Sequence, residues 1–136
     1  MKAIVTLLVL LALVTPAAAA DPPAQTFAAP IDRVWAVTLA VLKSLGWGID
    51  TADRSIGWIT TESRRLEGED YVVYAKGSRH KLVVRVKEAS SNRTTVNVER
   101  TVFKRERILW IDKDEPLTTT DQTVEKSILD AIGKSL

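Results

Sequence analysis

The chain has 136 residues and no cysteine, so disulfides, thiolate metal sites, cysteine nucleophiles and a thioether-linked lipid anchor are excluded. With 19 basic and 17 acidic residues the formal charge is only +2, which gives no long-range attraction to nucleic acid or to an anionic membrane surface. The length suits a single domain built around one hydrophobic core.

Residues 1–20 have the pattern of a secretory signal peptide. Lys2 gives a positive start, residues 3–14 are almost uniformly apolar, and Ala18 and Ala20 place small residues at the −3 and −1 positions of a cleavage site. The apolar run is shorter than the roughly 20 residues of a membrane-spanning helix. We therefore expect cleavage after Ala20 and a mature domain in the periplasm or outside the cell. The alternative is that the segment stays attached as an anchor.

The mature chain is expected to open with an extended leader followed by a helix. Residues 21–26 contain two prolines and form the leader. Pro30 suits the first turn of a helix, and Asp32 places a carboxylate near the positive end of the helix dipole. Apolar residues then recur at spacings of three and four as far as Leu45, and Gly46 is expected to end the helix.

The apolar pattern has a period of two through most of the remaining chain, which is typical of strands that are covered on one face. A polar loop is expected at residues 64–70 and a tight turn at Gly77 and Ser78. The expected strands are residues 25–27, 47–51, 56–63, 71–76, 80–87 and 93–104.

The last part of the chain predicts a charged connection and a second helix. Residues 108–111, Ile-Leu-Trp-Ile, are an apolar segment within this connection. The helix is expected to open at Thr119, with Gln122 three residues later in a capping-box arrangement. Its apolar stripe includes Ile128 and Ile132.

This order of elements predicts an α+β fold for a single domain at residues 27–136. The order is strand, helix, about five further antiparallel strands and a C-terminal helix. Two helices on one side of a curved antiparallel sheet would complete a two-layer core. We expect the sheet to wrap around a long terminal helix.

The residue types offer little catalytic chemistry. His80, the only histidine, begins an expected strand beside Arg79 and Lys81, so a solvated position and a lowered pKa are expected. Arg100 shares a strand face with Val98, where its charge needs a partner unless the strand has left the core. Two acidic clusters lack the spacing of a calcium loop and are expected in solvated loops: Glu67, Glu69 and Asp70, and Asp112, Asp114 and Glu115. We expect a protein that is not an enzyme and binds no metal or cofactor.

Two of the four tryptophans are candidates for lining a cavity. Trp47 and Trp58, together with Ile128 and Ile132, would enclose an apolar ligand between the sheet and the C-terminal helix. The alternative is that these large side chains simply fill the core of a domain without disulfides.

Trp110 is the candidate anchor for a partner. Leu109 and Ile111 flank it on an otherwise charged connection, and Arg107 lies at the rim. Apolar aromatic residues with arginine beside them are typical of the centre of protein interfaces. The alternative is that this segment packs as a small satellite of the core.

Three motifs lie close together in the N-terminal half: FxxPxDxVW at residues 27–35, LGWxI at 45–49 and DRxxGxIxT at 53–61. Together they resemble the helix-grip domains of BamC-like bacterial envelope lipoproteins, which are accessory parts of the outer-membrane β-barrel assembly machinery. The resemblance implies a helix-grip fold and an envelope protein as partner. Such proteins usually carry a lipobox cysteine, which this chain lacks, so no direct lipid anchor is expected.

The Pro-x-x-x-Val-Trp opening at residues 30–35 is also similar to the wider START-like and pathogenesis-related helix-grip proteins, many of which hold apolar ligands between sheet and helix. The leading expectation is therefore a non-enzymatic, periplasmic protein-interaction module of the bacterial envelope. The alternative is a carrier of a lipid or another apolar small molecule. Nucleic acid is not an expected partner.

Overall fold

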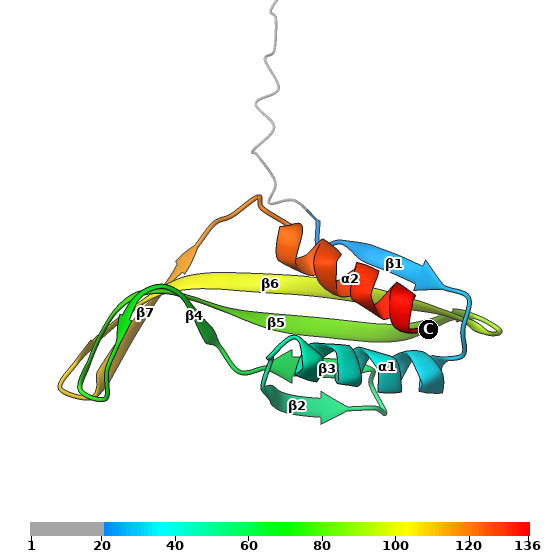
Figure 1. Cartoon of the computed structure of the whole chain (residues 1–136), viewed down its shortest axis with the longest axis horizontal. Coiled ribbons are helices and arrows are strands. Elements are labelled where there is room, and N and C mark those ends of the chain that lie inside the picture. Colours follow the sequence, from blue (N-terminus) through cyan, green and yellow to red (C-terminus); the bar gives the residue numbers. More distant parts are fainter. Residues whose placement is uncertain (1–20) are drawn as a thin grey trace, which may run out of the picture.

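The computed structural model describes residues 21–136, so the predicted signal peptide at residues 1–20 lies outside the described residues. The described chain has an α+β fold in which an open, seven-stranded antiparallel sheet carries two neighbouring helices (Figure 1). The predicted order of strand, helix, antiparallel strands and helix is confirmed. Six strands lie between the two helices, where about five were expected.

The two helices are α1 (Ile31–Ser44) and α2 (Thr123–Ser135). The strands are β1 (Ala24–Phe27), β2 (Ile49–Asp53), β3 (Trp58–Thr61), β4 (Arg64–Asp70), β5 (Tyr74–Ser90), β6 (Arg93–Ile108) and β7 (Ile111–Leu117). The order across the sheet is β1-β6-β5-β3-β2, with β4 also pairing with β5 and β7 also pairing with β6.

The strands β5 and β6 form one long hairpin that runs the length of the molecule. The half of this hairpin near the Ser90–Arg93 turn pairs with β1 and β3 and packs against both helices; we call it the body. The other half is a four-stranded sheet in the order β4-β5-β6-β7; we call it the arm. In Figure 1 the arm extends away from the helices and bends downward at the left.

The core lies between the helices and the sheet of the body. Buried residues of α1 recur at helical spacing, with Asp32 in the first turn and Gly46 just beyond the end at a φ of 86°, as predicted. The fully buried core side chains are Val34, Leu42, Ile59, Leu82, Val84, Val86, Val96, Val98, Ile128 and Ile132. Side chains along a strand point alternately to its two faces. In β5 and β6 the residues that alternate with these core residues therefore lie on the opposite face of the sheet, which no helix covers.

The prediction for the arm was wrong in three places. Residues 111–117, expected within a charged connection, form β7, which pairs with β6. Residues 64–70, expected as a loop, form β4, which pairs with β5. All seven residues of β4 are exposed, so no alternation of apolar and polar side chains reveals the strand. Gly77, expected in a turn, lies inside an unbroken β5. The turn is at Tyr71–Tyr74, where the Tyr71 N–H donates a hydrogen bond of 2.6 Å to the Tyr74 carbonyl.

The prediction for the second helix was also partly wrong. It begins at Thr123 rather than Thr119, and the Gln122 side chain makes no capping hydrogen bond. The Asp121 carboxylate instead accepts hydrogen bonds from the backbone N–H and the hydroxyl of Thr123, at 2.9 and 2.6 Å. With 13 residues against 14 in α1, α2 is not the long terminal helix that was expected.

Candidate functional site

The end of the arm carries two hairpin turns with exposed apolar side chains, one between β4 and β5 and one between β6 and β7. Tyr74 pairs with Ile108, so the two turns are neighbours, and Figure 1 shows both at the end of the arm farthest from the helices. We call the eight exposed residues of the two turns the apolar tip: Tyr71, Val72, Val73, Tyr74, Ile108, Leu109, Trp110 and Ile111.

The predicted anchor, Trp110, belongs to this surface and lies in the β6–β7 turn. Trp110 is 68% exposed and Ile111 is 73% exposed, so neither packs as a satellite of the core. The prediction of a strand at residues 71–76 is wrong at its start, because residues 71–74 form the β4–β5 turn. The signal that could have found it is the run Tyr-Val-Val-Tyr, which does not alternate and is therefore a poor match to a half-buried strand.

The β6–β7 turn has an unfavourable backbone for its residues. Ile108 pairs with Ile111, which leaves a two-residue loop in which Leu109 has a φ of 53° and Trp110 a φ of 66°. Tight hairpin turns with two positive φ angles favour Asn-Gly, because a side chain disfavours the left-handed region. Burial does not offset the cost of these positive φ angles, because the side chains of Leu109 and Trp110 are both exposed. This combination is typical of residues retained for binding rather than for stability.

Arg107 joins the two turns. Its guanidinium donates hydrogen bonds to Asp112 at 2.6 Å, to Asp70 at 2.8 Å and to the carbonyl of Tyr71 at 3.0 Å. Asp70 precedes the first turn and Asp112 follows the second. Arg107, predicted at the rim of a partner-binding surface, therefore connects the two turns from behind the apolar tip. Hydrogen bonding to Asp112 raises the pKa of Arg107 above the usual range.

The charges behind the tip are paired with each other. Arg105 binds Asp114 with two hydrogen bonds of 2.9 and 3.1 Å, and Arg79 binds Asp70 at 2.5 Å. The acidic clusters that were expected in loops thus lie in strands, and three of their carboxylates accept hydrogen bonds from arginines. These three arginines and three aspartates form a cross-strand network: Arg79, Arg105, Arg107, Asp70, Asp112 and Asp114.

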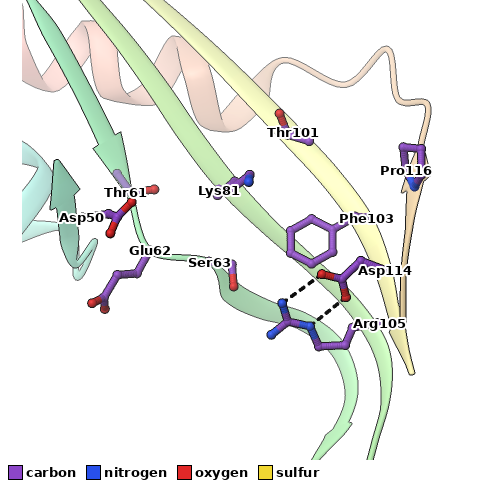
Figure 2. A pocket seen from close by; sticks show the side chains of 10 residues that line it. All are labelled: Asp50, Thr61, Glu62, Ser63, Lys81, Thr101, Phe103, Arg105, Asp114 and Pro116. Carbon is purple, nitrogen blue, oxygen red and sulfur yellow. Dashed lines mark hydrogen bonds and ion pairs between the residues drawn. The ribbon is translucent and has the colours of Figure 1, made fainter. Parts of the chain in front are cut away.

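A shallow groove of about 490 Å³ lies on the helix-free face, between the body and the arm (Figure 2). Phe103 lies in it, with the guanidinium of Arg105 5.4 Å and the ammonium of Lys81 6.0 Å from the ring centroid. The dashed lines in Figure 2 mark the pair that Arg105 forms with Asp114, which neutralises its charge. Ser63 accepts a hydrogen bond from Arg79 rather than donating one to a base. Ser63 therefore lacks the neighbouring base that would activate it as a nucleophile.

His80 is buried, which corrects the predicted solvated position at a strand end. It lies inside β5, only 5% exposed, with its ring centroid 4.7 Å from that of Trp47. Burial lowers the pKa of His80 to about 4, and the positive charges of Arg100, Arg64 and Arg79 add to this effect. The predicted direction is correct, but burial is the larger cause. The imidazole is neutral at pH 7 and is enclosed by the fold.

Arg100 is buried and paired. Its guanidinium donates a hydrogen bond of 3.0 Å to Glu125 on α2, and both side chains are almost fully buried. A second hydrogen bond of 3.1 Å reaches the carbonyl of Asp121, and a third contact of 3.3 Å joins Arg100 to His80 Nδ1. This cluster fastens α2 to the sheet, so its charges have a structural role.

Of the four cavity candidates, Trp58 is separated from the other three. Trp47, Ile128 and Ile132 are buried in the packed core. Trp58 lies on the helix-free face, where the Arg85 guanidinium stacks 4.8 Å from its ring centroid. None of the five pockets described for residues 21–136 is lined by any of the four.

Within residues 21–136, no group of histidine, aspartate and glutamate side chains has the arrangement of a metal site. No helix in this part of the chain is long and apolar enough to span a bilayer.

Comparison with known proteins adds no family assignment. No protein-family model matches the chain, and no curated protein matches it significantly. The likeness to BamC-like and START-like proteins therefore stays a prediction from the sequence motifs.

Proposed function

We propose that this chain is a non-enzymatic docking module of the bacterial cell envelope and that the apolar tip is its working surface. The observation that carries the proposal is the gathering of eight exposed apolar residues at one end of the molecule. Soluble monomers seldom expose a continuous apolar patch of this kind unless it binds something. The aromatic residues Trp110, Tyr71 and Tyr74 are of the types that dominate binding energy at interfaces.

The rest of the arm supports the choice of the tip. The two edge strands, β4 and β7, are rich in charged residues, and β7 also contains Pro116. Charges and proline on edge strands prevent pairing with other chains. The edge strands of the arm are therefore protected against pairing with other chains, whereas the end of the arm exposes apolar residues.

The proposed location rests on the export signal. Cleavage after Ala20 would leave Asp21, Pro22 and Pro23 at the start of the mature chain. Their carbonyls accept hydrogen bonds from Gln122, Asn97 and the backbone of Val98, respectively. We also propose that the fold is a variant of the helix-grip type, since β1 and α1 precede the antiparallel strands and α2 follows them.

A role without catalysis is supported by the state of the polar groups. His80, whose pKa is lowered to about 4, is enclosed by the core. Arg79, Arg105 and Arg107 of the arm are engaged by aspartates. A carrier function has less support, because Trp47, Ile128 and Ile132 are packed together in the core.

Fractionation of bacterial cells that express the chain tests this proposal. We expect the wild type to sediment with the envelope and the Leu109→Asn/Trp110→Gly double variant to remain soluble. Ile56→Asn is the matched control, because Ile56 is similarly exposed but lies in the β2–β3 turn of the body. Identical distribution of the wild type and the double variant would overturn the proposal.

A further inference from the structure

We propose that the apolar tip inserts into the surface of a phospholipid bilayer with electrically neutral headgroups. This inference rests on the proposed docking function and names its partner. It depends on the shape of the tip, on the charges behind it and on its aromatic residues.

The apolar tip lies at the end of the arm and not on one of the two faces of its sheet. Strands are spaced about 4.8 Å apart, so the four-stranded arm is roughly 14 Å wide. Ile108 and Ile111 share one face of the arm because they are cross-strand partners, whereas Leu109 and Trp110 occupy the turn itself. A protein partner would need a deep pocket to cover such an end from all sides. A bilayer surrounds whatever enters it, which suits apolar side chains that point in several directions.

The dimensions fit shallow insertion. At this end of the arm the exposed apolar residues lie in the two turns, and the paired charges of Arg107 and Asp112 begin directly behind Ile108 and Ile111. Interfacial segments bury their apolar side about 5 to 10 Å deep, which is close to the reach of a two-residue turn and its side chains. Trp110, Tyr71 and Tyr74 have amphipathic rings, which prefer the level of the headgroups.

The charges favour neutral lipids. Residues 67–76 and 104–115 contain five basic and seven acidic residues, so this part of the arm does not attract an anionic surface. The three arginines of the cross-strand network are neutralised by their aspartates. A belt of paired charges can lie among zwitterionic headgroups without leaving a charge unpaired.

Arg107 makes the two turns act together. By binding Asp70, Asp112 and the Tyr71 carbonyl, it holds both turns at the same end of the arm. Two adjoining apolar turns insert more area than one.

Sedimentation with phosphatidylcholine vesicles tests the inference. The wild type and the Ile56→Asn control should bind, and the Leu109→Asn/Trp110→Gly variant should bind about tenfold more weakly or less. Asn-Gly is the preferred sequence for this turn, so the variant should melt no lower than the wild type, and lost binding cannot be attributed to unfolding. Raising the salt concentration tenfold, or adding phosphatidylglycerol, should not strengthen binding.

Quenching by brominated lipids locates the inserted residue. All proteins are compared as the same chain species, confirmed by intact mass, so that any contribution of residues 1–20 is equal. Brominated phosphatidylcholine should quench the wild type, and this quenching should largely disappear in Trp110→Phe, which should still sediment with the vesicles. Equal quenching of the wild type and Trp110→Phe would overturn the inference, since Trp110 would then lie outside the bilayer.

Other outcomes separate this inference from the proposed function. If the tip variant leaves the envelope fraction in cells but the wild type does not bind vesicles, the docking function stands and the lipid partner is wrong. The same conclusion follows if binding requires phosphatidylglycerol. If analytical ultracentrifugation shows dimers that the tip variant abolishes, with no vesicle binding, the tip joins two copies of this chain instead.

Discussion

Arg100 carries a positive charge into the packed side of the sheet, next to core valines of β6. It is tolerated there because Glu125 supplies the opposite charge and the Asp121 carbonyl accepts another of its hydrogen bonds. Both partners lie at the start of α2, so this one side chain positions a helix as well as satisfying its own charge. A buried pair of this kind is costly to break, because the remaining charge stays almost fully buried without a counter-charge.

Replacing one member of this pair should therefore be strongly destabilising. We expect Glu125→Gln to lower the free energy of unfolding by about 3 kcal/mol, because it leaves Arg100 buried without a counter-charge. The matched control is Asp32→Asn, which breaks the exposed pair with Arg54 and should cost less than about 1 kcal/mol. Urea unfolding measures both values. Similar losses in the two variants would show that the buried pair is not a major contact.

The buried His80 predicts a loss of stability in mild acid. Its pKa is about 4 in the folded chain and 6.5 when it is free, so the unfolded state binds the additional proton between these values. Stability should be fully present above pH 6.5 and fall as the pH drops toward 4, by on the order of 3 kcal/mol. Urea unfolding of the wild type and His80→Gln across this range isolates the effect, since other groups titrate alike in both. Parallel pH profiles would contradict the prediction.

At the scale of elements, the arm depends on a close approach of two strands. Gly68 on β4 pairs with Gly77 on β5, and Gly68 has a φ of 93° beside an irregularity in the pairing. A β-carbon at position 77 would overlap the carbonyl oxygen of Glu67. Glycine inside a strand is typical of such close contacts between backbones. Glycine at position 77 is therefore explained by the close pairing of β4 with β5 and not by a turn.

Gly77→Ala should consequently detach β4 from β5 without unfolding the body. The expected result is fast hydrogen exchange at the amides of β4, while amides of the core strands near Val84 stay protected. Ser78→Ala, one position further along β5, is the control and should leave exchange unchanged. If β4 stays protected in Gly77→Ala, the backbone has room to adjust, and the close approach is not essential.

At the scale of the whole molecule, the body and the arm have different tasks. The body contains both helices and almost all of the buried apolar residues, and it supplies the stability of the fold. The arm has solvent on both faces and depends on strand pairing and charge networks. Mutations in the tip should accordingly alter docking far more than stability.

The export signal predicts a defined mature chain. After expression in a bacterium with a periplasm, the protein recovered from the envelope or the periplasm should begin at Asp21, because Ala18 and Ala20 meet the requirement of signal peptidase for small residues. Intact mass spectrometry measures this directly. Ala20→Lys should block cleavage and serves as the control. Recovery of the uncleaved chain as the main species would favour the anchor alternative.

The sequence was most informative where structure depends on neighbours in the chain. It predicted α1 and its end at Gly46, the two strands that correspond to β2 and β3, and the alternation of β5 in the body, because these follow from local periodicity. It also indicated the apolar segment at residues 108–111, since four apolar residues between charged ones stand out without any knowledge of the fold.

Only the tertiary structure decided what distant segments do together. Strand β4 exists because β5 offers a partner, Arg100 is tolerated because Glu125 reaches it from α2, and His80 is buried because Trp47 covers it. The apolar tip likewise requires two turns, 34 residues apart at Tyr74 and Ile108, to meet across β5 and β6. Such contacts have no local signature, because the free energy that forms them comes from long-range pairing and burial rather than from the preferences of each segment.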